Sequence, residues 1–171
     1  MKKPLMTLLA LAVCSPAFAA PPIPELKGIS LGETRDGVLK GTDYGCSTSA
    51  WIRSLCTWQT TLAGASAKIQ VVFNADDRVE MISAMEIDAD DFDQVVAGLR
   101  AKFGKASSCR KGVVTNLVGA RLDNLECSWI FRGWRIGATK RSRMTESSVT
   151  LASDVVLERA AQARGKSAGD M

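Results

Sequence analysis

Residues 90–104 read DDFDQVVAGLRAKFG, and their apolar side chains recur at i, i+3, i+4, i+7 and i+11. This spacing is typical of one stripe along an amphipathic α-helix. The residues of the stripe are Phe92, Val95, Val96, Leu99 and Phe103. Aspartates at the start suit the positive end of the helix dipole, and Gly104 suits a helix C-terminus. The pattern therefore predicts a helix over Asp90–Phe103 that buries one face.

The sequence before this helix has the character of strands. Three runs are separated by short turn-forming stretches, namely Thr57–Leu62, Lys68–Phe73 and Arg78–Ile87. The stretches between them are rich in glycine, serine, asparagine and aspartate, which favour turns. We expect a three-stranded antiparallel meander, in which Ile69, Val71 and Phe73 share one face of the middle strand.

A second set of strands is expected after the helix. Its members are Val113–Val118, Leu125–Phe131, Trp134–Thr139 and Ser147–Ala152. Arg132-Gly133 predicts a hairpin turn between two of them. Short helices are expected over Glu33–Lys40 and from Ser153 or Asp154 through Arg164. Helix and strands thus follow one another twice, although no residue-level repeat supports a duplication.

The predicted fold class is α+β, with antiparallel β meanders packed on one amphipathic helix and braced by two disulfides. Proline-rich residues 20–28 predict an extended lead-in, and residues 29–164 a single α+β domain. Residues 165–171 are expected to form a flexible tail.

The first residues have the features of a secretory signal peptide. Lys2 and Lys3 give it a positive start, and Leu5–Val13 is a short apolar run. Ala17-Phe18-Ala19 then provides small residues at positions −3 and −1, which predicts cleavage after Ala19. The apolar run is far shorter than the ~20 residues that span a bilayer, and no later stretch reaches that length. We therefore expect removal of residues 1–19 and no transmembrane segment.

A lipoprotein signal at Cys14 is the alternative to this cleavage. Such signals carry a small residue before the cysteine, whereas Val13 is branched and bulky. A complete cleavage site also follows a few residues later. We therefore expect a periplasmic or secreted protein that has lost Cys14 with its signal peptide.

Charge is mild in total but uneven along the chain. The 152 residues left after cleavage carry a net charge of +2, which does not favour nucleic acid as a partner. Eight acids lie between residues 76 and 93, and five bases without an acid lie between residues 132 and 143. The molecule is either electrically polarised, or these two segments face each other in the fold.

Four cysteines remain after cleavage, and these are Cys46, Cys56, Cys109 and Cys127. An even number in a small exported domain predicts two disulfides, for which three pairings exist. We favour Cys46–Cys56 with Cys109–Cys127, because each pair is local and brackets a turn-rich stretch. Closing such loops contributes on the order of 3 kcal/mol each. A zinc site is disfavoured, because the chain has no C-x-x-C spacing and no histidine.

The absence of histidine excludes several classes of enzyme. Nucleophilic triads with histidine, histidine metal sites and histidine acid–base chemistry are all unavailable to this chain. The acids at residues 88–93 lack the glycine and glutamate spacing of an EF-hand calcium loop. A pair of carboxylates that hydrolyses glycosides stays open, because that chemistry needs no histidine. We expect no metal, no cofactor and no catalytic residue.

One basic, aromatic hairpin is the strongest candidate for an interaction surface. Its residues are Trp129, Arg132, Trp134, Arg135, Lys140, Arg141 and Arg143. Arginine and tryptophan are the residue types enriched in interface hot spots, and they also suit anionic glycans or lipid head groups. In the alternative interpretation, the tryptophans face the core and the arginines are merely solvated.

The opening Ile29-Ser30-Leu31-Gly32-Glu33-Thr34, followed by a short helix and a meander, resembles the entry of BamE-like small bacterial envelope domains. The resemblance covers residues 29–87. It implies a style of fold, and no functional residue is carried over from it.

These observations favour a non-enzymatic binding protein of the bacterial periplasm. In its most concrete form it is an inhibitor or immunity protein that binds another envelope or secreted protein. The second hypothesis is an envelope-maintenance or assembly factor of the BamE-like style, which contacts membrane machinery or peptidoglycan. The third hypothesis is a carboxylate-based glycosidase.

Overall fold

Strands dominate the structure, a computed structural model that describes residues 22–48, 54–115, 118–119, 121–141 and 147–169, without the side chains of residues 114, 122, 141 and 163–169. The elements are β1 (Glu25–Leu26), β2 (Ile29–Ser30), α1 (Arg35–Leu39), β3 (Gly45–Ser47), β4 (Ser54–Leu62), β5 (Ala65–Phe73), β6 (Val79–Ile87), α2 (Phe92–Phe103), β7 (Ser108–Thr115), β8 (Arg121–Phe131), β9 (Trp134–Arg141), β10 (Ser147–Ser153) and α3 (Asp154–Gly169). The predicted α+β class is confirmed, with more strand than helix.

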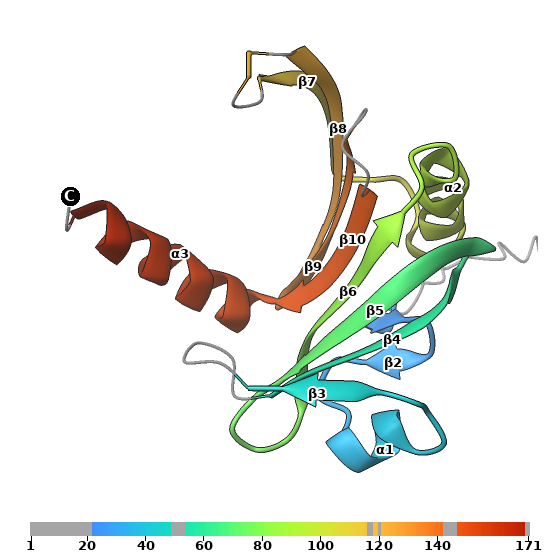
Figure 1. Ribbon diagram of the computed structural model, residues 1–171, viewed down its shortest axis with the longest axis vertical. Coiled ribbons are helices and arrows are strands. Elements are labelled where there is room, and N and C mark those ends of the chain that lie inside the picture. The colour runs from blue at the N-terminus through green and yellow to red at the C-terminus, as the bar shows by residue number, and fades with distance from the viewer. Residues whose placement is uncertain (1–21, 49–53, 116–117, 120, 142–146, 170–171) are drawn as a thin grey trace, which may run out of the picture.

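Eight of the strands form one antiparallel sheet in the order β3-β4-β5-β6-β10-β9-β8-β7. The two expected sets of strands therefore join, because β6 pairs with β10 in the middle of the sheet. β1 and β2 form a separate two-stranded ribbon. Figure 1 shows α2 beside the sheet near β5, while α3 leaves the end of β10 and projects away on the other side.

The strands follow one another in chain order from each edge of the sheet to its middle, β3 to β6 from one edge and β7 to β10 from the other. Each half consists of a helix followed by a four-stranded meander, α1 with β3–β6 and α2 with β7–β10. Cys56-Thr57-Trp58 on β4 and Cys127-Ser128-Trp129 on β8 occupy matching positions, next to the edge strand of each half. The fold therefore has an internal twofold pattern, which the sequence marks with one short motif.

Two matching hairpins follow these motifs. Leu62 pairs with Ala65 across Ala63-Gly64, and Phe131 pairs with Trp134 across Arg132-Gly133. Gly64 and Gly133 have φ values of +90° and +87°, a left-handed conformation that glycine adopts without steric cost. The hairpin turn predicted at Arg132-Gly133 is thus present. The first turn is shorter than expected, so β5 already begins at Ala65.

The predicted apolar stripe of α2 is buried along its whole length. Phe92, Val95, Val96, Leu99 and Phe103 are each at most 7% exposed and belong to the same core cluster as the inner sheet residues. Ile69, Val71 and Phe73 share the core face of β5, as the alternation predicted. Burying each such side chain contributes roughly 1.5–3 kcal/mol.

Several boundaries differ from those expected. α1 begins at Arg35, because the Thr34 side chain accepts a hydrogen bond from the Gly37 amide and caps the helix there. β7 begins at Ser108 rather than Val113, since Cys109 pairs directly with Cys127. α3 continues to Gly169, past Arg164 and into the segment expected as a tail.

Candidate functional site

At each edge of the large sheet, a disulfide joins the edge strand to the neighbouring strand. Cys46 on β3 lies directly opposite Cys56 on β4, and Cys109 on β7 lies directly opposite Cys127 on β8. The Sγ–Sγ distances are 2.01 Å and 2.05 Å. The favoured pairing of the four cysteines is therefore confirmed. Each disulfide ties an edge strand to its inner neighbour and restricts the freedom of that edge.

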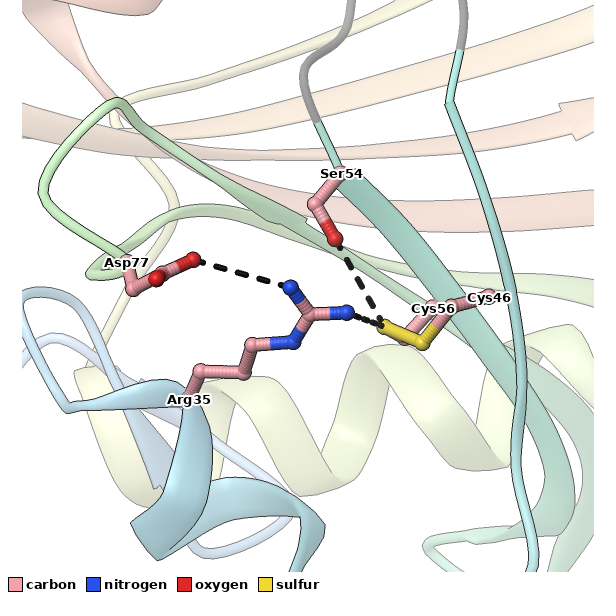
Figure 2. The surroundings of a disulfide bond; sticks show 5 residues. All are labelled: Arg35, Cys46, Ser54, Cys56 and Asp77. Atoms are coloured by element: carbon pink, nitrogen blue, oxygen red, sulfur yellow. Dashed lines mark hydrogen bonds and ion pairs between the residues drawn. A yellow bond between two sulfur atoms is a disulfide. The ribbon is translucent and has the colours of Figure 1, made fainter.

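The first disulfide has a cation beside its inner sulfur (Figure 2). Arg35 of α1 places its Nη2 atom 3.9 Å from Cys56 Sγ, and the Ser54 hydroxyl lies 3.9 Å from the same sulfur. Cys56 is fully buried, whereas Cys46 is exposed. The guanidinium also lies over the Phe73 ring, 5.7 Å from its centroid, so it is held by packing as well as by polar contacts.

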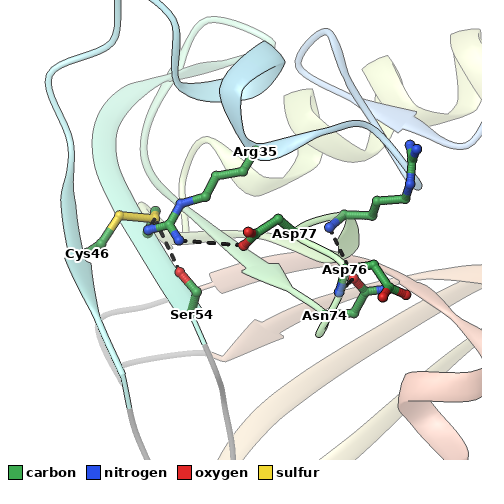
Figure 3. A network of polar contacts seen from close by, with 8 residues as sticks. Arg35, Cys46, Ser54, Asn74, Asp76 and Asp77 are labelled. Atoms are coloured by element: carbon green, nitrogen blue, oxygen red, sulfur yellow. Dashed lines mark hydrogen bonds and ion pairs between the residues drawn. A yellow bond between two sulfur atoms is a disulfide. The ribbon is translucent and has the colours of Figure 1, made fainter.

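The turn between β5 and β6 fixes the other side of this arginine (Figure 3). Asn74 Oδ1 accepts hydrogen bonds from the backbone amides of Asp76 and Arg78, at 2.9 Å and 3.0 Å. The turn places Asp77 Oδ1 3.6 Å from Arg35 Nη1, and the Asp77 carbonyl accepts from the Arg35 amide at 2.9 Å. The arginine is therefore held between a carboxylate and a sulfur.

Trp129 and Trp134 lie in the core and not on an exposed surface. Trp129 is 1% exposed, and its indole N–H donates to the Gly104 carbonyl at 2.9 Å. Trp134 is 9% exposed and stacks on Phe131 at a centroid distance of 4.0 Å. The expectation that these tryptophans form part of a surface is wrong, because alternation along β8 and β9 turns both toward α2.

The basic residues of the same hairpin have separate surroundings. Arg135 Nη2 lies 3.0 Å from an Asp154 carboxylate oxygen, and Lys140 Nζ lies 3.4 Å from Asp93 Oδ2. The second contact joins the basic segment to the acidic one, so the two segments face each other at this point. Arg132 is exposed at the hairpin turn. The Arg141 side chain and Arg143 lie outside the described residues.

The sheet face that points away from α2 carries a continuous row of short, mainly polar residues. Cross-strand pairing places seven of them side by side over seven strands: Thr57, Gln70, Ser83, Thr150, Gly137, Ser128 and Ser108. Hydroxyl groups hydrogen-bond within the row, Ser83 with Thr150 at 3.0 Å and Ser108 with Ser128 at 2.9 Å.

One parallel row lies on each side of these seven residues. The flanking residues are Leu55, Val72, Met81, Ala152, Arg135 and Ile130 on one side, and Gln59, Lys68, Met85, Ser148, Thr139, Glu126 and Arg110 on the other. We call the three rows together the open face. Most of its side chains are half-buried or exposed, and Ile130 is 59% exposed. The open face is thus a largely accessible surface, and its central row carries no charged residue.

An ion pair orders the rim of the open face. Lys68 Nζ donates to Glu86 Oε1 at 3.1 Å, and Gln59 Nε2 donates to Glu86 Oε2 at 3.3 Å. The hydrogen bond from Lys68, and then the one from Gln59, lowers the pKa of Glu86. Glu86 has a φ of +57° at an irregularity in the pairing of β6 with β10. The carboxylate therefore occupies a defined place beside Lys68.

Two further findings on the described residues concern metal sites and membrane-spanning helices. Within them, no group of three or more histidine, cysteine, aspartate or glutamate residues could hold a metal ion. None of the helices in this part of the chain combines the length and hydropathy needed to cross a membrane. No protein-family model, no curated protein and no solved structure matches the chain.

Proposed function

We propose that this chain is an exported, non-enzymatic binding protein whose open face contacts another protein of the cell envelope or a secreted protein. Residues 1–19 are removed after Ala19, and the mature chain acts in the periplasm or outside the cell. An inhibitor or an immunity protein is the concrete form of this function. The two disulfides support export of the chain, because disulfides persist in oxidising compartments.

The observation that carries this proposal is the composition of the open face. An antiparallel sheet often leaves one face to water, so an uncovered face alone indicates little. This face, however, combines a central row of short polar residues with exposed or half-buried apolar ones such as Ile130, Met81 and Met85. A centre without charged residues and the presence of adaptable methionines are typical of protein interfaces.

The exposed arginines extend this surface beyond the central row. Arg135 belongs to the open face, and Arg132 lies three residues before it at the hairpin turn. Arginine contributes to hot spots because its planar group makes several hydrogen bonds. The proposed interface therefore includes Arg132 and Arg135 of the basic hairpin and excludes its two buried tryptophans.

The test is capture of a partner from envelope extract with the oxidised mature chain (residues 20–171), followed by affinity measurements. Gln70→Arg and Thr139→Arg place a bulky charge on the open face, and each should weaken binding roughly tenfold or more. Ala97→Arg is the matched control, because Ala97 is exposed on α2. Equal binding by all three variants, with unchanged stability, would contradict the proposal.

A different result would favour the envelope-factor hypothesis. Retention on peptidoglycan or on vesicles with anionic lipid, without any protein partner, would indicate a role in envelope maintenance or assembly. Arg132→Glu should then abolish retention, because attraction to an anionic surface depends on charge.

A further inference from the structure

We propose that the Cys46–Cys56 disulfide is a site of thiol–disulfide exchange, with Cys46 as the attacked sulfur and Cys56 as the leaving sulfur. The chemical class of its reaction partner is a dithiol reductant. The inference rests on the surroundings of the two sulfurs and is independent of the proposed function.

The two sulfurs differ in access. Cys46 lies on β3, an edge strand of three residues that are all exposed. Cys56 lies on the neighbouring strand and is fully buried. Exchange begins with attack of a thiolate on one sulfur of the disulfide, so an outside reductant reaches Cys46 first.

The surroundings of the buried sulfur stabilise the thiolate that forms when the disulfide breaks. Burial in apolar surroundings raises the pKa of a thiol, whereas a nearby guanidinium lowers it. Arg35 Nη2 at 3.9 Å and the Ser54 hydroxyl at 3.9 Å both face Cys56 Sγ. Asp77 competes for Arg35 from 3.6 Å, but its side chain is 67% exposed and its attraction is therefore screened. The arrangement favours the Cys56 thiolate, and a more stable leaving thiolate departs faster.

The reaction balances in two steps. A thiolate of the dithiol attacks Cys46 Sγ, the Sγ–Sγ bond breaks, and its electron pair leaves on Cys56 Sγ, which faces Arg35. The second thiolate of the reductant then attacks the reductant sulfur in the mixed disulfide and expels the Cys46 thiolate. The reductant is oxidised to a disulfide, and Cys46 and Cys56 are reduced by two electrons.

The second disulfide provides an internal control. As in the first disulfide, one cysteine is buried and the other is accessible to a reductant: Cys127 is 3% exposed, and Cys109 is exposed. In the described part of the chain, however, no side chain hydrogen-bonds to Cys127 Sγ. Arg100 and Lys105 line a hollow next to Cys109, on the side of the attacked sulfur. The reductant should therefore carry no charge other than that of its attacking thiolate.

The experiment treats the oxidised mature chain with limiting dithiothreitol, followed by acid quenching, alkylation and peptide mass mapping. We expect Cys46–Cys56 to open first. Arg35→Gln should slow its opening roughly threefold to tenfold, because the leaving thiolate loses its cation. Arg35→Lys should restore part of the rate. Arg78→Gln is the matched control, since the exposed side chain of Arg78 donates to the Gly32 carbonyl and not to a sulfur, and it should leave the rate unchanged.

Three results would overturn the proposal: earlier opening of Cys109–Cys127, an unchanged or faster rate in Arg35→Gln, or a first adduct on Cys56. If Arg35→Gln does not fold, Cys46→Ser provides a second measurement. The Cys56 thiol of this variant should titrate below the ordinary value of about 8.5. Titration at or above that value would contradict the role assigned to Arg35.

Discussion

The two edges of the sheet hold equivalent strands, β3 and β7, each joined to its inner neighbour by a disulfide. In both halves a tryptophan lies two residues after the buried cysteine of the disulfide. Trp129 is buried and donates to the Gly104 carbonyl at the end of α2, whereas Trp58 is only half-buried. Beside Cys56 lies Arg35 instead. One edge therefore anchors a helix through an indole, and the other holds a cation against a disulfide.

The difference between the edges separates the features that the two halves share from those that they do not. The backbone pattern and the covalent link are the same in both halves, so they set the shape of the sheet. The side chains behind the buried cysteine differ between the halves, although a disulfide secures the edge strand in both. If the halves share their backbone pattern but differ in these side chains, matching substitutions in the two halves should have unequal effects.

The largest effect is expected from the two matching tryptophans. Trp129→Ala should destabilise the protein by about 3–5 kcal/mol, because it leaves a large cavity and an unpaired Gly104 carbonyl. Trp58→Ala should cost roughly half as much, since its side chain is already partly in water. Urea unfolding of both variants measures the difference. Equal losses would contradict the assignment of Trp129 as the anchor of α2.

A smaller effect is expected at the two matching turns. A Cβ on Gly64 would lie 2.8 Å from Gln94 Nε2, whereas a Cβ on Gly133 meets nothing within 4 Å. Both substitutions place alanine in a left-handed backbone conformation, which costs about 1–2 kcal/mol. Gly64→Ala should cost more, because it also displaces the Gln94 amide that donates to the Ala63 carbonyl at 2.6 Å.

A double-variant cycle isolates this extra cost. Gln94→Ala removes the crowding and should bring the cost of Gly64→Ala down to that of Gly133→Ala, measured by thermal unfolding. An unchanged cost of Gly64→Ala in the Gln94→Ala background would show that crowding plays no part.

The smallest effect concerns a contact between α2 and the separate β1–β2 ribbon. Lys102 of α2 donates to Glu25 of β1 at 2.9 Å, and this hydrogen bond lowers the pKa of Glu25 from its ordinary value of 4.5. A lowered pKa in the folded state stabilises the protein above pH 4.5, and this stabilisation is lost as the pH falls through the folded-state value. Because the pair is largely exposed, its effect is about a few tenths of a kcal/mol.

Glu25→Gln should therefore lower stability slightly at pH 7. The difference from the unaltered chain should shrink as the pH falls below 4.5 and through the folded-state pKa of Glu25, because protonated Glu25 also lacks the charge. Lys102→Gln should behave in the same way. A constant difference across the whole range would contradict the role of the ion pair.

Local patterns predicted a large share of this fold. The stripe of α2, the shared face of Ile69, Val71 and Phe73, the turn at Arg132-Gly133 and the disulfide pairing all follow from neighbours in sequence. The pairing of β6 with β10 could not be predicted in this way, because it joins residues that are sixty or more positions apart. The motif shared by the two halves spans three residues, too few to indicate a repeat.

The site was less predictable than the fold. Alternation indicates which residues of a strand share a face, but not which face meets the core, and so the sequence left both a surface and a core position open for Trp129 and Trp134. The contact of Arg35 with Cys56 crosses 21 positions and depends on how α1 packs on β4. The open face required the strand order, which no local pattern contains.

The central claim is that a protein partner binds the open face, and its two methionines report on this directly. Met81 and Met85 lie on β6, half-buried on that face. Peroxide oxidation of the mature chain, with and without the captured partner and read by mass spectrometry, measures their accessibility. We predict that the bound partner protects both methionines. Oxidation of both at unchanged rates in a saturated complex would contradict binding at the open face.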